Sequence, residues 1–290
     1  MKKTLSLLLV LVMVLSLCSV TAFAAENYTG KTVILYTANV RGDVDVYVKV
    51  AAAKTAYENA GADVILADAG NFLQGTAAAN SDRGLGVYNL MDAAGYDVAA
   101  MGLAEFGYAD ATTGYGYHKN VTKYYTQAEL QNGAKALTYN KDMKGKVTAD
   151  RAEKAAATFT ALSANAVSDT EYYSFEASTV LTTKSGLKVG FYGLTATSAA
   201  ANVQDGCLRV SEPKPVRLNA DVTICLSNAG VSGSEYGDLV IDAGNAETVG
   251  AYVIDNSSKT VTSLTPDLSG SDAEIAKSAA ALKAAAGKTV

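Results

Sequence analysis

The sequence predicts an α/β fold in which most of the strands are parallel. Short apolar runs rich in β-branched residues alternate with helical segments, as in "TVILYT" followed by "VYVKVAAAKTAYENAG". The same alternation returns in "ADVILADAGN" followed by "GLGVYNLMDAAGY". Strands that read as continuous apolar runs are typical of parallel sheets whose two faces are both covered. We therefore expect an α/β sandwich.

The first 24 residues have the layout of a secretory signal peptide. Two lysines precede a long apolar run that ends in Ala22-Phe23-Ala24, a small-residue cleavage site. The run would also fit a membrane anchor, but the cleavage site favours its removal. Cys18 follows the bulky Leu17, which argues against a lipoprotein signal. We expect a secreted or cell-surface protein with no membrane span after removal of residues 1–24.

Composition excludes several classes of protein. Apolar residues make up 49% of the chain, so it is globular rather than disordered. The net charge is −5 and no cluster of Lys or Arg interrupts it, which argues against a nucleic-acid partner. The single histidine, His118, excludes any site that needs several imidazoles. Two cysteines follow the signal segment, Cys207 and Cys225, and either a disulfide or free thiols fit an exported protein.

The second half of the chain repeats the strand pattern. Buried strands that end in small residues are predicted in "FTALSANAV", "KVGFYGLTA", "ADVTICLSNAG" and "GDLVIDAGN", and a strand with its loop in "DVAAMGLAEF". The stretch "STVLTTKSGLKVGFYGL" predicts a hairpin that turns at Lys184-Ser185-Gly186. The tail, residues 267–290, predicts an alanine-rich and largely solvated helix from Asp272, capped by Ser271.

Residues 108–150 fit this pattern less well. They are rich in Tyr, Gly, Asn and Thr and have no sustained apolar period before "RAEKAAATF". We interpret them as an insertion or long loop that precedes a helix at "RAEKAAATF". Its tyrosines are either part of a binding surface or packed against the surface of the domain.

Small-residue loops follow the predicted strands, and their motifs carry a resemblance. The loops are "TANVRG", "DAGNFLQGT", "MGLAEFGY" and "LSNAG", with "DAGNAET" as a fifth. In order and spacing they resemble "HTNDxHG", "DAGDxxQGT", "GNHEFD", "LSHxG" and "GGHxH" of the calcineurin-like metallophosphoesterase superfamily, in particular the amino-terminal domain of the secreted 5′-nucleotidase family. The resemblance covers Lys31 to about Val261. It implies an α/β/β/α sandwich over residues 25–266, with residues 108–150 inserted.

The departures from the family motifs fall on its metal ligands. In the family these loops hold two divalent metals, and a metal-bound water attacks phosphorus. Side chains that cannot support such a site occupy the ligand positions here: Asn39, Arg41, Asn71, Leu103, Ala104, Asn228, Gly244 and Ala246. Two close divalent cations need anionic oxygen and imidazole ligands. The loops have therefore kept their pattern and lost the residues that would hold metal.

The residues around the lost ligands remain. Among them, Asp68 and Glu105 are expected to accept hydrogen bonds from loop backbone N–H groups. The family's nucleotide-binding second domain is expected to be absent. An alternative is a single divalent metal held by Asp43, Asp45, Asp68 and Glu105, although acidic pairs such as the first two are common on solvated surfaces.

These residues predict a function without hydrolysis. We expect a catalytically inactive, exported protein that acts as a binding or interaction module and needs no cofactor. A small anion or a phosphorylated ligand would bind in the former active-site cleft, lined by Asn39, Arg41, Asp68, Asn71, Gln74, Glu105 and Asn228. The alternative is a weak or altered metal-dependent phosphohydrolase of the nucleotide phosphatase type.

Overall fold

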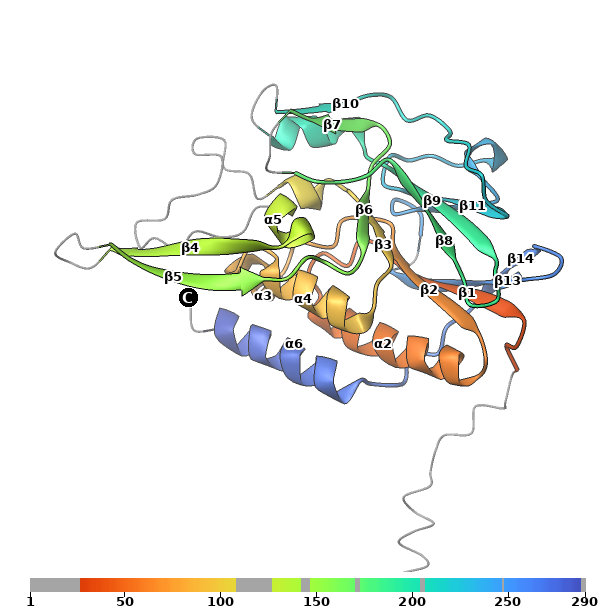
Figure 1. Ribbon diagram of the computed structural model, residues 1–290, viewed down its shortest axis with the longest axis horizontal. Helices are drawn as coiled ribbons and strands as arrows, with labels where there is room; N and C mark the ends of the chain where they lie inside the picture. Colours follow the sequence, from red (N-terminus) through yellow and green to blue (C-terminus); the bar gives the residue numbers. More distant parts are fainter. Residues whose placement is uncertain are drawn as a thin grey trace, which may run out of the picture.

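Two β-sheets packed face to face form the centre of the molecule (Figure 1). The computed structural model describes residues 27–107, 127–141, 147–169, 173–203, 207–246 and 248–287. The predicted signal peptide, residues 1–24, lies outside the described residues, as does His118. No helix within the described ranges is long and apolar enough to cross a bilayer.

The larger sheet has six strands in the order β14-β13-β1-β2-β3-β6. Its parallel part consists of β1 (Lys31–Thr37), β2 (Asp63–Asp68), β3 (Val98–Ala100) and β6 (Thr160–Leu162). Two antiparallel strands, β13 (Val249–Asp255) and β14 (Val261–Leu264), extend it beyond β1. Parallel β1 and β2 end at the same edge, which is the edge where their loops carry the sequence motifs.

The smaller sheet has four strands in the order β12-β11-β9-β8. These are β8 (Ser178–Thr182), β9 (Lys188–Leu194), β11 (Val222–Ser227) and β12 (Leu239–Asp242). Strands β9, β11 and β12 are parallel, whereas β8 and β9 form the predicted antiparallel hairpin. Gly186 in its turn has φ of +89°, a conformation that glycine adopts without steric cost.

Helices cover the outer face of the larger sheet (Figure 1). They are α2 (Val44–Asn59), α3 (Ala77–Ser81), α4 (Leu85–Ala94) and α6 (Ala273–Ala286). The predicted tail helix exists as α6, and most of its residues are exposed, as expected, while one face packs on the domain. Ile275, Ala279 and Ala286 are buried, since α6 contacts α2, α3 and α4. Its N-cap is Asp272, not Ser271, and the Asp272 carboxylate accepts hydrogen bonds from Glu274 N and Ile275 N.

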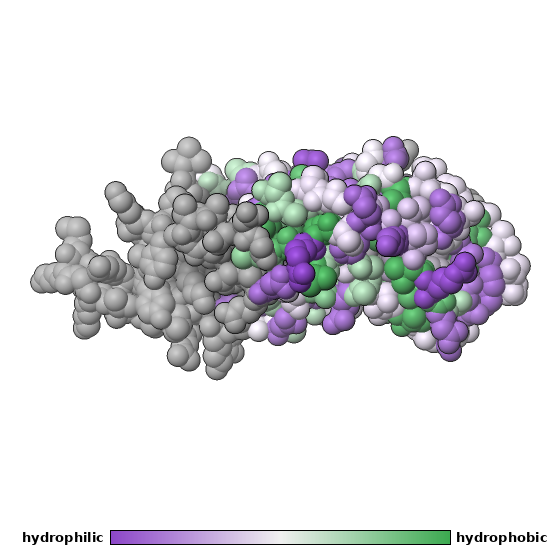
Figure 2. Space-filling view, turned by 90° about the horizontal axis from the view of Figure 1, so that it is seen from above, coloured by the Kyte–Doolittle hydropathy of each residue, from purple (hydrophilic) through white to green (hydrophobic). Residues whose placement is uncertain are grey.

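An extended segment, rather than a helix of the described chain, covers the outer face of the smaller sheet. Val216 and Leu218 pack there on Tyr192, Leu194 and Cys225. Figure 2 shows polar and apolar residues interspersed over the face seen from above. Both cysteines are free, and burial raises the pKa of the Cys225 thiol to about 12. The predicted α/β sandwich with mostly parallel strands is confirmed, with this difference in one outer layer.

The region predicted as an insertion contains a short helix and a hairpin. They are α5 (Gln127–Asn132), β4 (Ala134–Lys141) and β5 (Val147–Lys154), with β4 antiparallel to β5. Residues 108–126 and 142–146, with most of the tyrosines, lie outside the described residues. The helix predicted at "RAEKAAATF" is wrong, because residues 151–154 pair with β4 as part of β5. Cross-strand pairing overrides the weak helical propensity of a short alanine-rich segment.

The smaller elements complete the framework. A two-stranded ribbon pairs β7 (Ala166–Ser168) with β10 (Leu208–Val210). The short 3₁₀ segments are η1 (Ala104–Phe106), η2 (Thr197–Asn202) and η3 (Ser234–Tyr236). Between the two sheets lies an apolar core that includes Ile34, Phe191 and Ile224.

The cap of α6 provides a test of its packing. Replacing Asp272 with Ala should lower the free energy of unfolding by about 1 kcal/mol, because two backbone N–H groups lose their acceptor. Replacing Ser271 with Ala should change it by less than about 0.5 kcal/mol. Urea unfolding measures both. Equal losses in the two variants would contradict the assignment of Asp272 as the cap.

Candidate functional site

Five loops meet where the parallel strands end. We name each after the strand that it follows: the β1 loop (38–43), the β2 loop (69–76), the β3 loop (101–107, with η1), the β11 loop (228–233) and the β12 loop (243–246). Backbone hydrogen bonds join the first two, from Asn39 N to Gly70 O (3.0 Å) and from Arg41 N to Asn71 O (2.9 Å). The convergence expected from the motifs is therefore present.

Three positions in these loops have a backbone conformation that is uncommon for residues other than glycine. The φ angles are +52° for Asn39, +49° for Arg41 and +66° for Asn71. Asn tolerates the left-handed region better than most residues, whereas Arg does not share this preference. Such angles persist only where the surrounding contacts hold them. The contacts that do so here link one loop to the next.

A chain of side-chain amides links four of the loops. The Asn39 amide donates to Ala243 O in the β12 loop. Asn71 Nδ2 donates to Asn39 Oδ1 (2.8 Å), and Ala104 N in the β3 loop donates to Asn71 Oδ1 (3.1 Å). Both amides thus have a donor and an acceptor contact inside the protein.

Asn228 makes the equivalent link for the β11 loop. Its Nδ2 donates to Met101 O in the β3 loop (3.1 Å), and its Oδ1 accepts from Ala196 N after β9 (3.1 Å). Asn39, Asn71 and Asn228 stand at positions where the resemblance places metal ligands. Here all three form cross-links between loops instead.

Glu105 joins the β2 and β3 loops through its buried side chain. Its buried carboxylate accepts four backbone N–H groups, from Asn71 (2.9 Å), Phe72 (2.7 Å), Leu73 (3.1 Å) and Gly102 (2.6 Å). Burial raises the pKa of this carboxyl group, and the four donors act in the opposite direction. Glu105 therefore occupies the structural role expected from the sequence.

Asp68 has a similar role at the end of β2. It is fully buried, accepts from Thr37 Oγ1 (2.5 Å) and Gly70 N (2.6 Å), and Thr37 Oγ1 lies 2.8 Å from Tyr96 OH. Burial raises the pKa of Asp68 well above its usual value, since two hydrogen bonds do not replace its full hydration.

Asp242 is a third such carboxylate, and the sequence reasoning missed it. It accepts from Gly230 N (2.9 Å), Val231 N (3.1 Å) and Gly244 N (2.9 Å), and so joins the β11 and β12 loops. The signal was present in the sequence, because "DAGN" occurs twice, from Asp68 and from Asp242. In both copies the Asp side chain accepts from the N–H two residues later, as in an Asx turn.

A cavity of about 410 Å³ opens beside these loops. Its lining consists of Arg41, Asn71, Gln74, Gly75, Asn80, Leu103, Ala104 and Asn202. Three of the seven predicted cleft residues, Arg41, Asn71 and Gln74, therefore line it. Asn39 and Asn228 do not, since their amides bind neighbouring loops, and Asp68 and Glu105 lie buried beneath. Gly244 and Ala246 are not part of this lining either.

The four carboxylates of the single-metal alternative have separate environments. Asp43 is exposed and caps α2 through Asp45 N (3.2 Å). Asp45 is exposed and forms an ion pair with Lys283 (2.5 Å). Within the described ranges, no group of three or more His, Cys, Asp or Glu side chains could hold a metal ion. These four positions are thus not gathered into one site.

The amide chain predicts coupling between Asn39 and Asn71. Replacing each with Gly keeps the positive φ at no steric cost and removes only the amide. In a double-mutant cycle the two changes should show a coupling of about 0.5–3 kcal/mol, as expected for directly bonded side chains. Additive losses in urea unfolding would show that the two amides do not act together. Gln74→Ala, at another residue of the β2 loop, serves as a single-mutant control.

Asp68 predicts a pH dependence of stability. Since burial raises its pKa above 3.8, the folded protein retains this proton at pH values where the unfolded chain has released it. Its contribution is thus fully present below the ordinary pKa and is lost as the pH rises through the folded pKa. The Asp68→Asn variant should lack this loss of stability, which is about 1.4 kcal/mol for each pKa unit by which folding raises the pKa of Asp68. Urea unfolding at several pH values tests this, and parallel curves for parent and variant would contradict it.

Comparison with known proteins shows which solved structures have a similar fold. No protein-family model matches the sequence, and no curated protein matches it. Among solved structures, a 5′-nucleotidase precursor from Thermus thermophilus superposes with a TM-score of 0.55 at 15% identity, covering 89% of this chain and 59% of that one. The calcineurin-like phosphoesterase YfkN from Bacillus subtilis gives 0.51 at 12% identity, covering 89% of this chain and 98% of that one.

A third similar structure contains a bound small molecule. A Staphylococcus aureus protein assigned as a 5′-nucleotidase, in complex with α-ketoglutarate, gives a TM-score of 0.53 at 12% identity and covers 88% of this chain. The chain spans 58% of that protein, so it corresponds to about six tenths of both nucleotidase structures. The expectation from the loop motifs is confirmed: this chain has the fold that calcineurin-like phosphoesterases and 5′-nucleotidases share.

Proposed function

We propose that this protein is an exported binding module without phosphoesterase activity, and that the cavity beside the β1, β2 and β3 loops holds a small anion or the anionic group of a larger ligand. The observation that carries the proposal is the side chain of Arg41, which is unpaired within the described part of the chain. Its guanidinium lines the cavity and has no hydrogen bond or ion pair with any described residue.

The charge of the cavity supports an anionic ligand. None of its lining residues is acidic, and Arg41 is the cation among them. Gln74 adds an amide beside the guanidinium. A guanidinium can bind a carboxylate or a phosphate through two parallel hydrogen bonds, which are stronger than hydrogen bonds between neutral groups. Leu103, 38% exposed on the rim, offers an apolar contact to the remainder of the ligand.

The chemistry of the loops supports a function without hydrolysis. Metal-assisted attack on phosphorus requires ligands that hold the metal and an activated water. Here the amides at three ligand positions bind other loops, and two further positions carry Leu103 and Ala104, which have no side-chain ligand atom. Arg41 brings positive charge to the same place. The amides, Leu103 and Ala104 disfavour a divalent cation, and the charge of Arg41 also favours an anion.

Anion binding should depend on Arg41. Calorimetry with inorganic phosphate, sulfate and α-ketoglutarate should detect binding of at least one of these anions by the parent at millimolar concentration. The Arg41→Asn variant, which tolerates the positive φ, should bind it at least tenfold more weakly, about 1.4 kcal/mol. Arg209→Ala is the matched control, because Arg209 pairs with Asp169 on the β7–β10 ribbon. No binding by the parent, or equal binding by Arg41→Asn, would refute the anion site.

Hydrolysis should be absent whichever metal is supplied. With manganese, zinc, cobalt or calcium, the purified protein should not release phosphate from nucleoside monophosphates or p-nitrophenyl phosphate, because the metal-binding side chains are missing. Metal-dependent turnover that is lost in Glu105→Gln would instead support the alternative of an altered metal-dependent phosphohydrolase.

The intact mass of the exported protein tests the predicted signal peptide. A mature chain that starts near Ala25 is expected, and a cytoplasmic form that retains Met1 would contradict export.

A further inference from the structure

The two sheets have different numbers of strands, and the difference leaves one region uncovered. The larger sheet has six strands and the smaller sheet four. Strand β9 contacts β3 and β6, and β11 contacts β3, so the smaller sheet is stacked on that end of the larger one. Beyond β11 it continues only as β12, whose one hydrogen-bonded neighbour among the described strands is β11. Ile254 of β13 is covered by the smaller sheet, whereas the half-buried Tyr252 and the exposed Ser263 lie where the larger sheet extends past β12.

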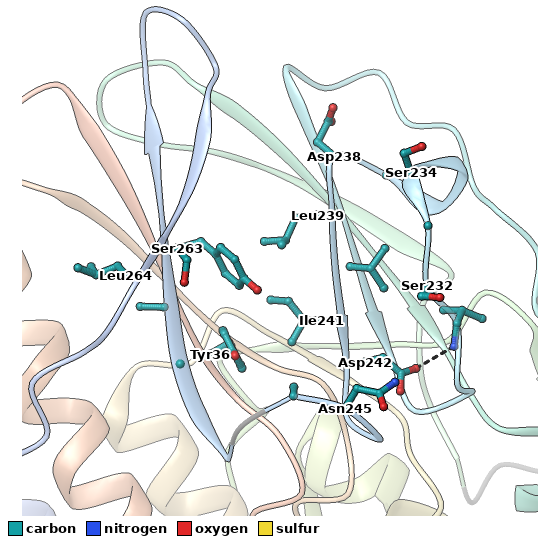
Figure 3. Close-up of a pocket in the computed structure, with 18 of the residues that line it drawn as sticks. Tyr36, Ser232, Ser234, Asp238, Leu239, Ile241, Asp242, Asn245, Ser263 and Leu264 are labelled. Atoms are coloured by element: carbon teal, nitrogen blue, oxygen red, sulfur yellow. Dashed lines mark hydrogen bonds between the residues drawn. The ribbon is translucent and has the colours of Figure 1, made fainter.

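A groove occupies the place of a further strand. It has a volume of about 640 Å³ and is lined by β12 and the segment before it (231–237) on one side and by β13 and β14 on the other. Figure 3 shows Leu239 and Ile241 reaching from β12 toward Tyr36 and Ser263 across this space. The rings of Tyr36 and Tyr252 stack at 5.9 Å along the opposite wall. The groove therefore has a mixed lining, in which polar residues such as Ser232, Asp238 and Ser263 lie beside the two tyrosines, and an open strand edge.

The main chain of β12 has the alternation that strand addition requires. Asp238 N donates to Thr223 O on β11 (2.9 Å), and the parallel register continues through Val240 opposite Cys225. Because alternate residues of a strand direct their backbone groups to opposite sides, Leu239 and Ile241 direct theirs away from β11, toward the groove. An extended segment placed there would gain the backbone partners that β12 leaves open on this side.

We propose that the groove between β12 and the β13–β14 pair binds an extended peptide segment of a partner protein, which adds to the smaller sheet as a fifth strand. Strand addition of this kind takes affinity from main-chain hydrogen bonds and specificity from pockets for alternate side chains. Alternate residues of the segment are apolar, to meet the half-buried Tyr252 beside the buried Leu239 and Ile241. The four residues of β12 set the length of the paired core.

Charge defines the ends of the segment. The groove is lined by Asp238 and Asp242 and by no Lys or Arg. Asp242 is buried and accepts from three loop N–H groups. The exposed Asp238 therefore carries the accessible negative charge of the lining, and no cationic side chain of the lining offsets it. A segment with basic flanking residues is therefore complementary, and an acidic one is not.

The same charges disfavour a second copy of this chain as the occupant. Antiparallel pairing of two β12 strands centred on Val240 would set Asp238 of each copy opposite Asp242 of the other. Like charges directly opposite destabilise an antiparallel pair. The edge strand of a second copy would also carry its own β13–β14 pair into the groove.

A peptide library with a matched pair of variants tests the proposal. Ser263 lines the groove and Thr262, next to it on β14, does not, so their side chains lie on opposite faces of the same exposed edge strand. Phage-displayed random heptapeptides are selected against the parent and counter-selected against Ser263→Trp, in which the indole obstructs part of the groove. Recovered peptides are synthesised, and their affinities are measured by fluorescence anisotropy.

The proposal expects peptides with alternating apolar residues and basic flanks. Ser263→Trp should weaken their binding at least tenfold, whereas Thr262→Trp should stay within about twofold. Only every second amide of an added strand faces β12, so N-methylation of that set of peptide amides should abolish binding, whereas N-methylation of the other set should not. The amides of Leu239 and Ile241 should become protected from hydrogen exchange in the complex.

Four results would overturn it. They are a selection that recovers no peptide able to distinguish parent from Ser263→Trp, binding that is insensitive to N-methylation, and a concentration-dependent dimer that Ser263→Trp abolishes. The last is protection of the Leu239 and Ile241 amides in the free monomer, which would show that the chain's own residues already occupy the groove.

Discussion

The arrangement of the loops depends on buried carboxylates and amides that bind backbone groups across them. Glu105 gathers three consecutive N–H groups of the β2 loop and one of the β3 loop. Asp242 does the same for the β11 and β12 loops, and the Asn39–Asn71 pair joins the two sets. Buried backbone N–H groups cost free energy unless they have a partner, so these side chains fix where each loop lies. The positive φ of Asn39, Arg41 and Asn71 is a consequence of that fixing.

This arrangement explains how the loops are held in place by carboxylates and amides of the protein itself. Two adjacent divalent cations would join several loops through their ligands. The same task is performed here by hydrogen bonds of Asn39, Asn71 and Asn228, whose amides carry no charge to attract a cation. Arg41 remains free of these contacts. The structural role of the amides is therefore compatible with the binding role that we propose for the cavity.

Much of the fold could be predicted from the sequence, because buried parallel strands give continuous apolar runs and the loop motifs follow them. The amide chain could not, since it depends on side-chain directions that only the packed loops determine. Asn39 and Asn228 were expected to line the cleft for this reason, whereas both point to neighbouring loops. The error at residues 151–154 has a similar origin, because pairing with β4 decides their conformation. Leu239 and Ile241 read as an ordinary strand, and only the strand order shows that their edge is open.

If the protein's own side chains hold the five loops without a metal, chelator and manganese should leave its thermal stability unchanged. Thermal unfolding of the chelator-treated protein, with and without manganese, measures this. Because a ligand that binds only the folded state raises the apparent stability by about 2.7 kcal/mol at one hundred times its Kd, a functional metal site would be visible as a shift in Tm. The account predicts the same Tm in chelator and in millimolar manganese. A Tm that rises with manganese and falls with chelator would contradict it.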